Sequence, residues 1–311
     1  MEYYVDHLGR SKASITVELL ADKLLTRKKL ENKSTRYLTD LEWRLKPFIR
    51  DFGSRLAADV TTEEISLWLI GLELSPVSVG NYRRVLSVLF SHGVKLKAVD
   101  KDKNPAKGAF QPESLEGEIG FLSVAQACAL PKAANDEPEI LPVVVLGLFA
   151  GIRTEELKRL DWKDVSLFRG YVTISAVHAK TKTKRKIAMM PALRSWLEPV
   201  QALSGPVWPA KQQRGRHILE AVREAAGFDE KTPWPHNALR HSFGSYHAAM
   251  FQNIAALSLE MGNSPKVVDK HYRNADVEKE DAEKFWSLTR ERVLRSKVLV
   301  PSSIQNVADS A

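Results

Sequence analysis

The chain has 311 residues and a formal net charge of +8, so about two domains and a polyanionic partner, nucleic acid before an anionic membrane, are expected. Its single cysteine, Cys128, excludes an intrachain disulfide framework and a zinc site built from several thiolates, which fits a cytosolic protein. The polar residues 1–10 hold no secretory signal core, and the longest apolar run, 141–150, is too short to span a bilayer.

The first hundred residues are predicted to form amphipathic helices that pack as a small bundle. Apolar residues recur at helical spacing from 15 to 30 and again after Ser34, whose hydroxyl can cap a helix. Thr61 and Glu64 form a capping box before a third helix, and Pro76 occupies the first turn of a fourth. The basic residues of these helices are expected on the outside, either as DNA contacts or as an ordinary solvated face.

The chain is predicted to consist of this helical domain, a linker, a second domain and a tail. The helical domain is expected to cover 10–100. Residues 101–119 lack periodicity and hold several glycines and prolines, which is typical of a linker. The second domain is expected at 120–297, and 298–311 is expected to form a loose tail.

Within the second domain, hydrophobic periodicity predicts helices around one β-hairpin. Alternating residues at 171–177 and a return strand at 187–190 flank a lysine-rich segment, which predicts a hairpin turn. Helices are expected at 123–134, 137–150, 154–160, 212–226, 237–250, 253–260, 264–272 and 278–296. The apolar residues of the last helix would either dock on a neighbouring molecule or close their own domain. The predicted fold class is therefore mainly α with a small β-hairpin or sheet.

Three separated motifs of the second domain place arginines and a tyrosine in contexts suited to phosphoryl transfer. The first, Gly-Ile-Arg-Thr-Glu-Glu-Leu, contains Arg153, and the second, His-Asn-Ala-Leu-Arg-His-Ser-Phe, contains Arg240. The third runs from the Gly-Asn-Ser-Pro turn at Asn263 to Tyr272, nine residues later. Together with the lysine-rich segment between the first two, and in this order, the motifs resemble the tyrosine recombinase (phage integrase) family over roughly residues 10–290.

The resemblance implies a SAM-like, core-binding helical bundle followed by a DNA breaking-rejoining catalytic domain. It implies a site-specific recombinase or integrase that forms a 3′-phosphotyrosyl intermediate without a metal ion or a high-energy cofactor. The implied partner is double-stranded DNA, on which a homo-tetramer assembles, with room for accessory DNA-bending or directionality factors. A membrane has no part in this scheme.

The residue types fit this chemistry. A side-chain oxygen that attacks a phosphodiester leaves a covalent intermediate, and the negative charge of the transition state suits two guanidiniums. By the resemblance, Arg153 and Arg240 bind the scissile phosphate, and Glu156 orients the arginine pair. Tyr272 is the implied nucleophile, whereas Tyr246 is expected to be structural.

The acid that protonates the leaving 5′ oxygen stays open between two lysines. Lys180 fits the family's hairpin lysine best when the residues are counted back from the start of the return strand. Lys182 is the alternative, because the length of the turn varies between relatives.

Two histidines of the family pattern are absent. Asn237 stands where the family has histidine three residues before the second arginine, and Asn263 stands where it has histidine or tryptophan. Asparagine can donate a hydrogen bond to a phosphate but carries no proton at neutral pH. His236 and His271 are therefore alternative proton carriers.

Two other function classes stay open. The departures at Asn237 and Asn263 also fit a DNA-binding relative that has lost catalysis. A type IB topoisomerase-like enzyme would relax DNA without exchanging strands. The sequence does not specify the target site, the host, or whether the reaction integrates, excises or resolves DNA.

Overall fold

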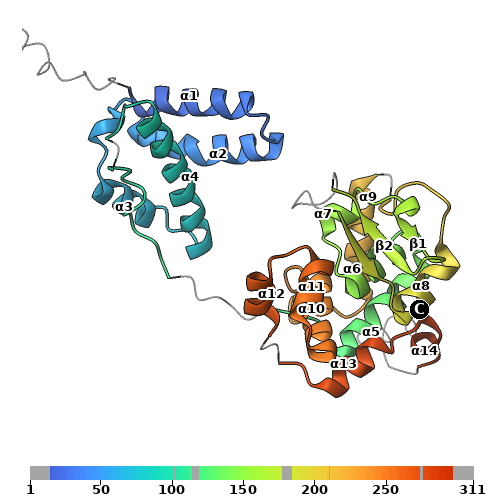
Figure 1. The fold of residues 1–311 in the computed structure, drawn as a ribbon. Coiled ribbons are helices and arrows are strands. Elements are labelled where there is room, and N and C mark those ends of the chain that lie inside the picture. Colours follow the sequence, from blue (N-terminus) through green and yellow to red (C-terminus); the bar gives the residue numbers. More distant parts are fainter. Residues whose placement is uncertain are drawn as a thin grey trace, which may run out of the picture. The chain divides into compact units, whose positions relative to one another are not determined.

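The computed structural model describes residues 15–100, 102–113, 119–176, 184–209, 211–273 and 276–296. The chain divides into two compact units, residues 1–117 and 118–311, and each has its own hydrophobic core. Figure 1 shows helices in both units and short strands in the second. The described residues are mainly helical with a small antiparallel sheet, so the predicted fold class is confirmed.

The described part of the first unit is helical. Its elements are α1 (Val17–Leu30), α2 (Thr35–Phe52), the 3₁₀ turn Ala57–Asp59, α3 (Thr62–Gly71) and α4 (Pro76–Lys95). Ser34, Thr61 and Ser75 cap α2, α3 and α4, because each hydroxyl accepts a hydrogen bond from a backbone N–H of the first turn. Glu64 completes the capping box of α3, so the helix starts read from the sequence are confirmed.

Residues 102–113, which the sequence predicts as part of a linker, pack against α4. Ala106 is fully buried, and Nδ2 of Asn104 donates to a backbone carbonyl of α4 at 2.9 Å. Arg83 of α4 donates through Nε to the carbonyl of Ala109 at 2.9 Å. Its guanidinium therefore binds its own unit, although the sequence predicts the basic residues of these helices on the outside, as DNA contacts or as a solvated face.

The described part of the second unit combines helices with one sheet. The helices and 3₁₀ turns are α5 (Val124–Ala133), Ala134–Asp136, α6 (Leu141–Ala150), α7 (Thr154–Leu157), Trp162–Asp164, α8 (Pro191–Leu197), Glu198–Val200, α9 (Gln212–Ala225), α10 (Ala238–Phe251), α11 (Ile254–Met261), α12 (Pro265–Tyr272), α13 (Lys279–Trp286) and α14 (Arg290–Arg295). The sheet has the order β1 (Val165–Ser166), β2 (Tyr171–Ile174), β3 (Arg185–Ala188), with antiparallel pairs throughout. The return strand thus begins two residues earlier than predicted.

Some predicted helices are shorter or divided. The helix predicted at 137–150 starts later, because its first residues form turns rather than helix. The segment 278–296 forms α13 and α14, since Thr289 interrupts the first helix and caps the second. Phe285 is fully buried and stacks on Tyr246 with 4.1 Å between ring centroids. Of the two alternatives for this segment, the structure therefore favours closure of its own domain.

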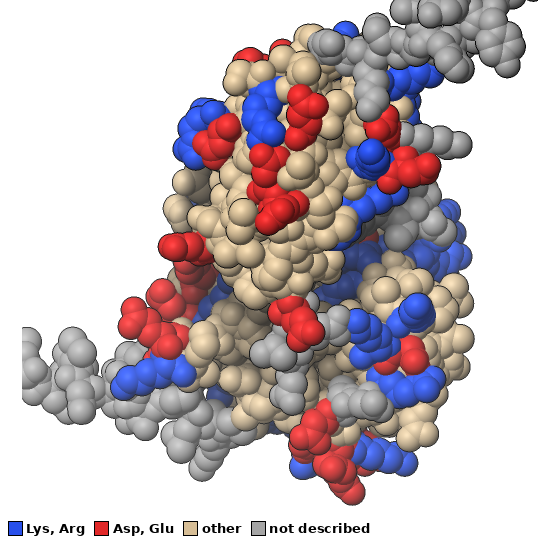
Figure 2. Space-filling view, turned by 90° about the vertical axis from the view of Figure 1, so that its left-hand side faces the viewer, with Lys and Arg blue, Asp and Glu red and all other residues tan. Residues whose placement is uncertain are grey.

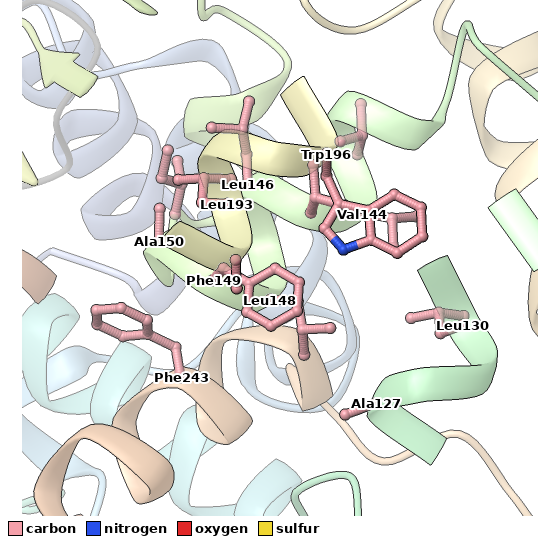
Figure 3. Packing of buried hydrophobic residues seen from close by; sticks show 14 of the residues in the cluster. Ala127, Leu130, Val144, Leu146, Leu148, Phe149, Ala150, Leu193, Trp196 and Phe243 are labelled. Atoms are coloured by element: carbon pink, nitrogen blue, oxygen red, sulfur yellow. The ribbon is translucent and has the colours of Figure 1, made fainter. Parts of the chain in front are cut away.

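Helix α6 is apolar around its whole circumference, and every residue in it is buried. Figure 3 shows its side chains together with Leu130 of α5, Trp196 of α8 and Phe243 of α10. The helix ends at Gly151, whose backbone is left-handed with a φ of +59°. A Cβ at Gly151 would lie 2.4 Å from Cδ1 of Phe243, so this position requires glycine. The turn leads directly to Arg153.

Candidate active site

Arg153 lies between this turn and α7, and its guanidinium is held from two sides. Its Nη1 donates to Oε1 of Glu156 at 3.1 Å, and its backbone N–H donates to Oε2 of the same carboxylate at 3.2 Å. Its Nη2 donates to the carbonyl of Gly262 at 3.0 Å and to Oδ1 of Asn263. Because 18% of the side chain is still exposed, the fixed guanidinium can receive an anion from solvent.

Glu156 is the buried acid of the site, with 2% of its surface exposed. It also accepts a bidentate pair from Arg185, with Nη1 to Oε1 at 3.1 Å and Nη2 to Oε2 at 2.6 Å. Burial acts to raise the pKa of Glu156, but the hydrogen bond from Arg185 and the charges of Arg185 and Arg153 outweigh it and hold that pKa below its ordinary value. One ionised carboxylate thus faces two guanidiniums, and the cluster keeps a net positive charge.

The C-terminal end of α11 anchors three guanidiniums on consecutive backbone carbonyls. The pairs are Nε of Arg185 with Glu260 (2.8 Å), Nη2 of Arg240 with Met261 (2.7 Å) and Nη2 of Arg153 with Gly262 (3.0 Å). The last carbonyls of a helix lack partners within the helix and carry partial negative charge, so they stabilise cations. This shared anchor sets the spacing of guanidiniums that come from three separate segments.

Arg240 lies in the first turn of α10 and is 8% exposed. Its Nη1 donates to the carbonyl of Gly151, which ties it to the end of α6. Burial, and after it the charge of Arg153, lowers the pKa of Arg240 to about 9. Its hydrogen-bond partners among the described residues are two neutral carbonyls, so its charge is left for an anion.

Tyr272 is the last residue of α12, and its ring is buried against α10. A Cβ added at Gly244 would lie 2.5 Å from Cε1 of this ring, so the missing side chain of Gly244 makes room for it. Burial raises the pKa of Tyr272 to about 12, while the charges of Arg240 and Arg153 act to lower it. The tyrosine oxygen therefore lies within the electrostatic field of both arginines.

His241 follows the second arginine and contacts the tyrosine. Its Nδ1 is 2.9 Å from the hydroxyl oxygen of Tyr272. Burial, followed by the charges of Arg240, His271 and His236, lowers the pKa of His241 to about 4. The imidazole is therefore neutral at physiological pH, and its Nδ1 can accept the hydrogen bond of the phenol when the ring proton is on Nε2.

Both asparagines lie at the arginine site. Asn237 has a left-handed backbone with a φ of +53° and lines a pocket that Arg153 and Arg240 also line. Its Nδ2 is 3.0 Å from Nδ1 of His236, which is exposed. Asn263 accepts a hydrogen bond from Arg153 through Oδ1, which leaves its amide nitrogen free to donate to another group.

The remaining site predictions have different outcomes. Lys180 and Lys182 lie outside the described residues. His271 is exposed on α12, with 6.3 Å between its ring centroid and that of the tyrosine at the end of the helix. Tyr246 is buried, and its hydroxyl donates to the carbonyl of Leu122 at 2.9 Å, which is a structural tie.

Two residues of the site have no role in the sequence interpretation. Arg185 belongs to the lysine-rich run, and the signal that could distinguish it is its position at the start of β3, where alternate residues face inward. His241 looks like an ordinary histidine beside an arginine. Its contact with Tyr272 depends on the packing of α12 against α10, which no local sequence pattern encodes.

The described residues hold no group of three or more His, Cys, Asp and Glu side chains that could bind a metal ion. Within the same part of the chain, each helix is too short or too polar to cross a membrane. Cys128 is buried and unpaired with any other cysteine.

The first unit has a basic pocket between α1 and α4. Its basic lining residues include Arg27, Lys28, Arg84 and Lys95. Glu31 neutralises part of this charge through ion pairs with Arg27 at 3.0 Å and Lys28 at 2.7 Å. Figure 2 shows Lys and Arg side chains interspersed with Asp and Glu side chains among the described residues of the visible face.

Comparison with known proteins identifies both a family and a shared fold. Residues 122–276 match the phage integrase family, whereas no curated protein gives a significant match. A lambda integrase dimer bound to a COC′ core site aligns with a TM-score of 0.68 and 17% identity, over 84% of this chain and 96% of that chain. A lambda integrase tetramer bound to a Holliday junction aligns with a TM-score of 0.68 and 18% identity, over 86% and 80% of the two chains.

A transposon protein has the same fold. The Tn1549 transposon integrase in complex with a circular intermediate DNA aligns with a TM-score of 0.67 and 18% identity, over 87% of this chain and 98% of that chain. At these identities the likeness establishes the fold alone.

Proposed function

Since the chain belongs to the phage integrase family, we propose that it is a site-specific DNA recombinase that cuts and rejoins DNA through Tyr272. The main support is the assembly of Tyr272 with Arg153 and Arg240 at one site, from three separated segments. The scissile phosphate binds against the two guanidiniums, one of which has only neutral carbonyl partners among the described residues.

In the first step, the oxygen of Tyr272 attacks the phosphorus of the scissile phosphodiester. A 3′-phosphotyrosyl bond forms, the bond from phosphorus to the 5′ oxygen breaks, and the phenolic proton moves toward Nδ1 of His241. Because the pKa of Tyr272 is about 12 and that of His241 about 4, the proton leaves only as the new bond forms. Arg153 and Arg240 offset the negative charge that grows on the non-bridging oxygens.

The leaving 5′ oxygen needs a proton to become a hydroxyl. Lys180 is the proposed acid, and Lys182 is the alternative. Rejoining reverses the steps, because the 5′ hydroxyl of a partner strand attacks the phosphotyrosyl phosphorus and returns a proton to Tyr272. The phosphotyrosyl bond retains the energy of the phosphodiester, so the exchange requires no high-energy cofactor.

Asn237 and Asn263 act as neutral hydrogen-bond donors to the phosphate in this scheme. Asn237 lines the pocket beside both arginines, and the amide of Asn263 is oriented by the hydrogen bond from Arg153 to its Oδ1. Neither asparagine can exchange a proton at neutral pH. His236 and His271, both exposed, are the alternative proton carriers.

Double-stranded DNA is the proposed partner, and a homo-tetramer on DNA is the proposed active assembly, because exchange between two duplexes needs four cleavages. Lambda integrase, which has the same fold, forms a tetramer on a Holliday junction. In the first unit, the pocket at Arg27, Arg84 and Lys95 is the proposed contact with the DNA backbone. Accessory DNA-bending or directionality factors are compatible with this assembly.

A trapping experiment tests this function. A duplex site is selected from randomised DNA by binding to the Tyr272→Phe variant, and is then nicked so that cleavage releases a short fragment and strands the intermediate. The wild-type chain should form a protein–DNA adduct that survives denaturant. If the wild-type chain binds this site and forms no adduct, the proposal is wrong.

A catalytically impaired DNA-binding protein is the second candidate, favoured by Asn237 and Asn263 in place of two histidines. It would bind the selected site without an adduct. A type IB topoisomerase-like enzyme would form the adduct, and would also relax a supercoiled plasmid that carries a single site, without strand exchange.

A further inference from the structure

A third guanidinium lines the pocket beside the proposed phosphate site. Arg223 of α9 borders the same pocket as Arg153, Arg240 and Asn237, together with Trp234. It belongs to none of the motifs that identify the family. The family motifs therefore imply no role for Arg223, whereas the contacts of its side chain indicate one.

The guanidinium of Arg223 is supported by an aromatic platform. Its Cζ lies 4.1 Å from the centroid of the Trp234 ring, over the ring face. Trp234 in turn packs edge to face on Phe228, with 4.8 Å between centroids. A cation held on an aromatic ring in this way is ordered without losing its charge, so it can still attract an anion.

No carboxylate among the described residues forms an ion pair with Arg223. Its Nε is buried and has no hydrogen-bond partner in the same part of the chain. Burial lowers the pKa of Arg223, and the charge of Glu220 only opposes that shift. An unpaired, half-buried cation is costly to keep. Binding of an anion in the pocket offsets this cost.

Arg214 lies on the same helix and, unlike Arg223 within the described part of the chain, forms an ion pair with a carboxylate. It is paired with Glu139, with 2.8 Å between Nη2 and Oε1. The two arginines are nine residues apart (223 minus 214), which is about 2.5 helical turns, so they lie on opposite sides of α9. Of these two arginines, Arg223 is the one that lines the pocket, and it is the one without a carboxylate partner among the described residues.

We propose that Arg223, held on Trp234, binds a DNA phosphate next to the scissile phosphate and so positions the strand over Arg153 and Arg240. The inference rests on the proposed function, because it takes this pocket as the DNA-facing side of the site. Arg223 is then a positioning residue, which acts through the placement of the strand and not on the reacting atoms.

Salt-dependent binding tests this proposal. The Tyr272→Phe variant is titrated with a random-sequence duplex at several KCl concentrations, alone and combined with Arg223→Ala, Arg223→Lys or Arg214→Ala. Loss of one phosphate contact lowers the slope of log K against log[salt] by about 0.9. Arg223→Ala should show this loss, whereas Arg223→Lys keeps the charge and should keep the slope. Arg214→Ala removes the same charge from the opposite side of α9 and should leave the slope unchanged.

A slope that Arg223→Ala does not change, or that Arg214→Ala lowers equally, would overturn the proposal. Thermal unfolding without DNA separates a purely structural role. Arg223→Ala removes a cation without a carboxylate partner among the described residues, so it should unfold near the wild-type temperature. A marked drop in that temperature with an unchanged slope would assign Arg223 to packing. The binding result does not depend on cleavage, because the Tyr272→Phe variant is expected to cleave no DNA. A wild-type chain that fails to cleave DNA would therefore contradict the recombinase function but not the role of Arg223 in binding.

Discussion

Replacing Glu156 by glutamine should destabilise the second unit strongly. Glu156→Gln nearly keeps the shape of the side chain but leaves Arg153 and Arg185 without the carboxylate that both bind. Breaking a buried ion pair by removing one partner costs about 3–5 kcal/mol. In a domain of 150–250 residues, each kcal/mol lowers the unfolding temperature by about 2–4 °C, so the expected loss is about 6–20 °C.

Scanning calorimetry at neutral pH measures this loss, and Glu155→Gln is the matched control. Glu155 is 51% exposed and pairs with Lys158, and exposed pairs contribute only about 0–1 kcal/mol. The pKa of Glu156 is lowered in the folded state, so its stabilisation is complete above the ordinary value of 4.5 and is lost as pH falls through the folded pKa. The difference between wild type and Glu156→Gln should shrink accordingly in acid. Equal unfolding temperatures at neutral pH would refute the role of Glu156 as the anchor of the cluster.

Three further predictions concern catalysis. Arg153→Lys and Arg240→Lys keep the charge but lose the planar guanidinium, so each should slow cleavage by about 10²–10³-fold. DNA binding at fixed salt should change much less. If cleavage and binding fall equally, these residues are simple phosphate anchors. If Lys180 or Lys182 is the acid, its alanine variant should cleave slowly, and a substrate with sulfur in place of the 5′ oxygen should restore the cleavage rate, because the sulfur leaves without a proton. If neither alanine variant is rescued, another residue is the acid. Burial lowers the pKa of His241 to about 4, so the cleavage rate should lack an inflection near the ordinary imidazole value of about 6.5, and such an inflection would require another histidine as a proton carrier.

Much of the fold can be predicted from the sequence because its signals are local. Ser34, Thr61 and Ser75 satisfy backbone donors within their own first turns, so each helix start is visible in a few residues. The packing of 102–113 on α4 is not visible in this way. It depends on hydrogen bonds from Arg83 to distant carbonyls, and a stretch without periodicity looks like a linker.

The candidate site, like the fold, can be predicted only in part from local sequence patterns. Motif spacing is enough to single out the arginines and the tyrosine, since they stand in short patterns of fixed length. The reason that they meet is not in those patterns. Three guanidiniums bind successive carbonyls at the end of α11, and the ring of Tyr272 fits only because Gly244 has no side chain. Arg185 therefore appears in the sequence as one more basic residue of a lysine-rich run, although it is a partner of the buried Glu156.

Peptide mapping of the trapped protein–DNA adduct tests the central claim most directly. After nuclease digestion and proteolysis, mass spectrometry should find the nucleotide on Tyr272, and the Tyr272→Phe variant should bind the same duplex without forming an adduct. A nucleotide on Tyr246 or on any other residue, or an adduct that persists in Tyr272→Phe, would contradict the assignment of Tyr272 as the nucleophile.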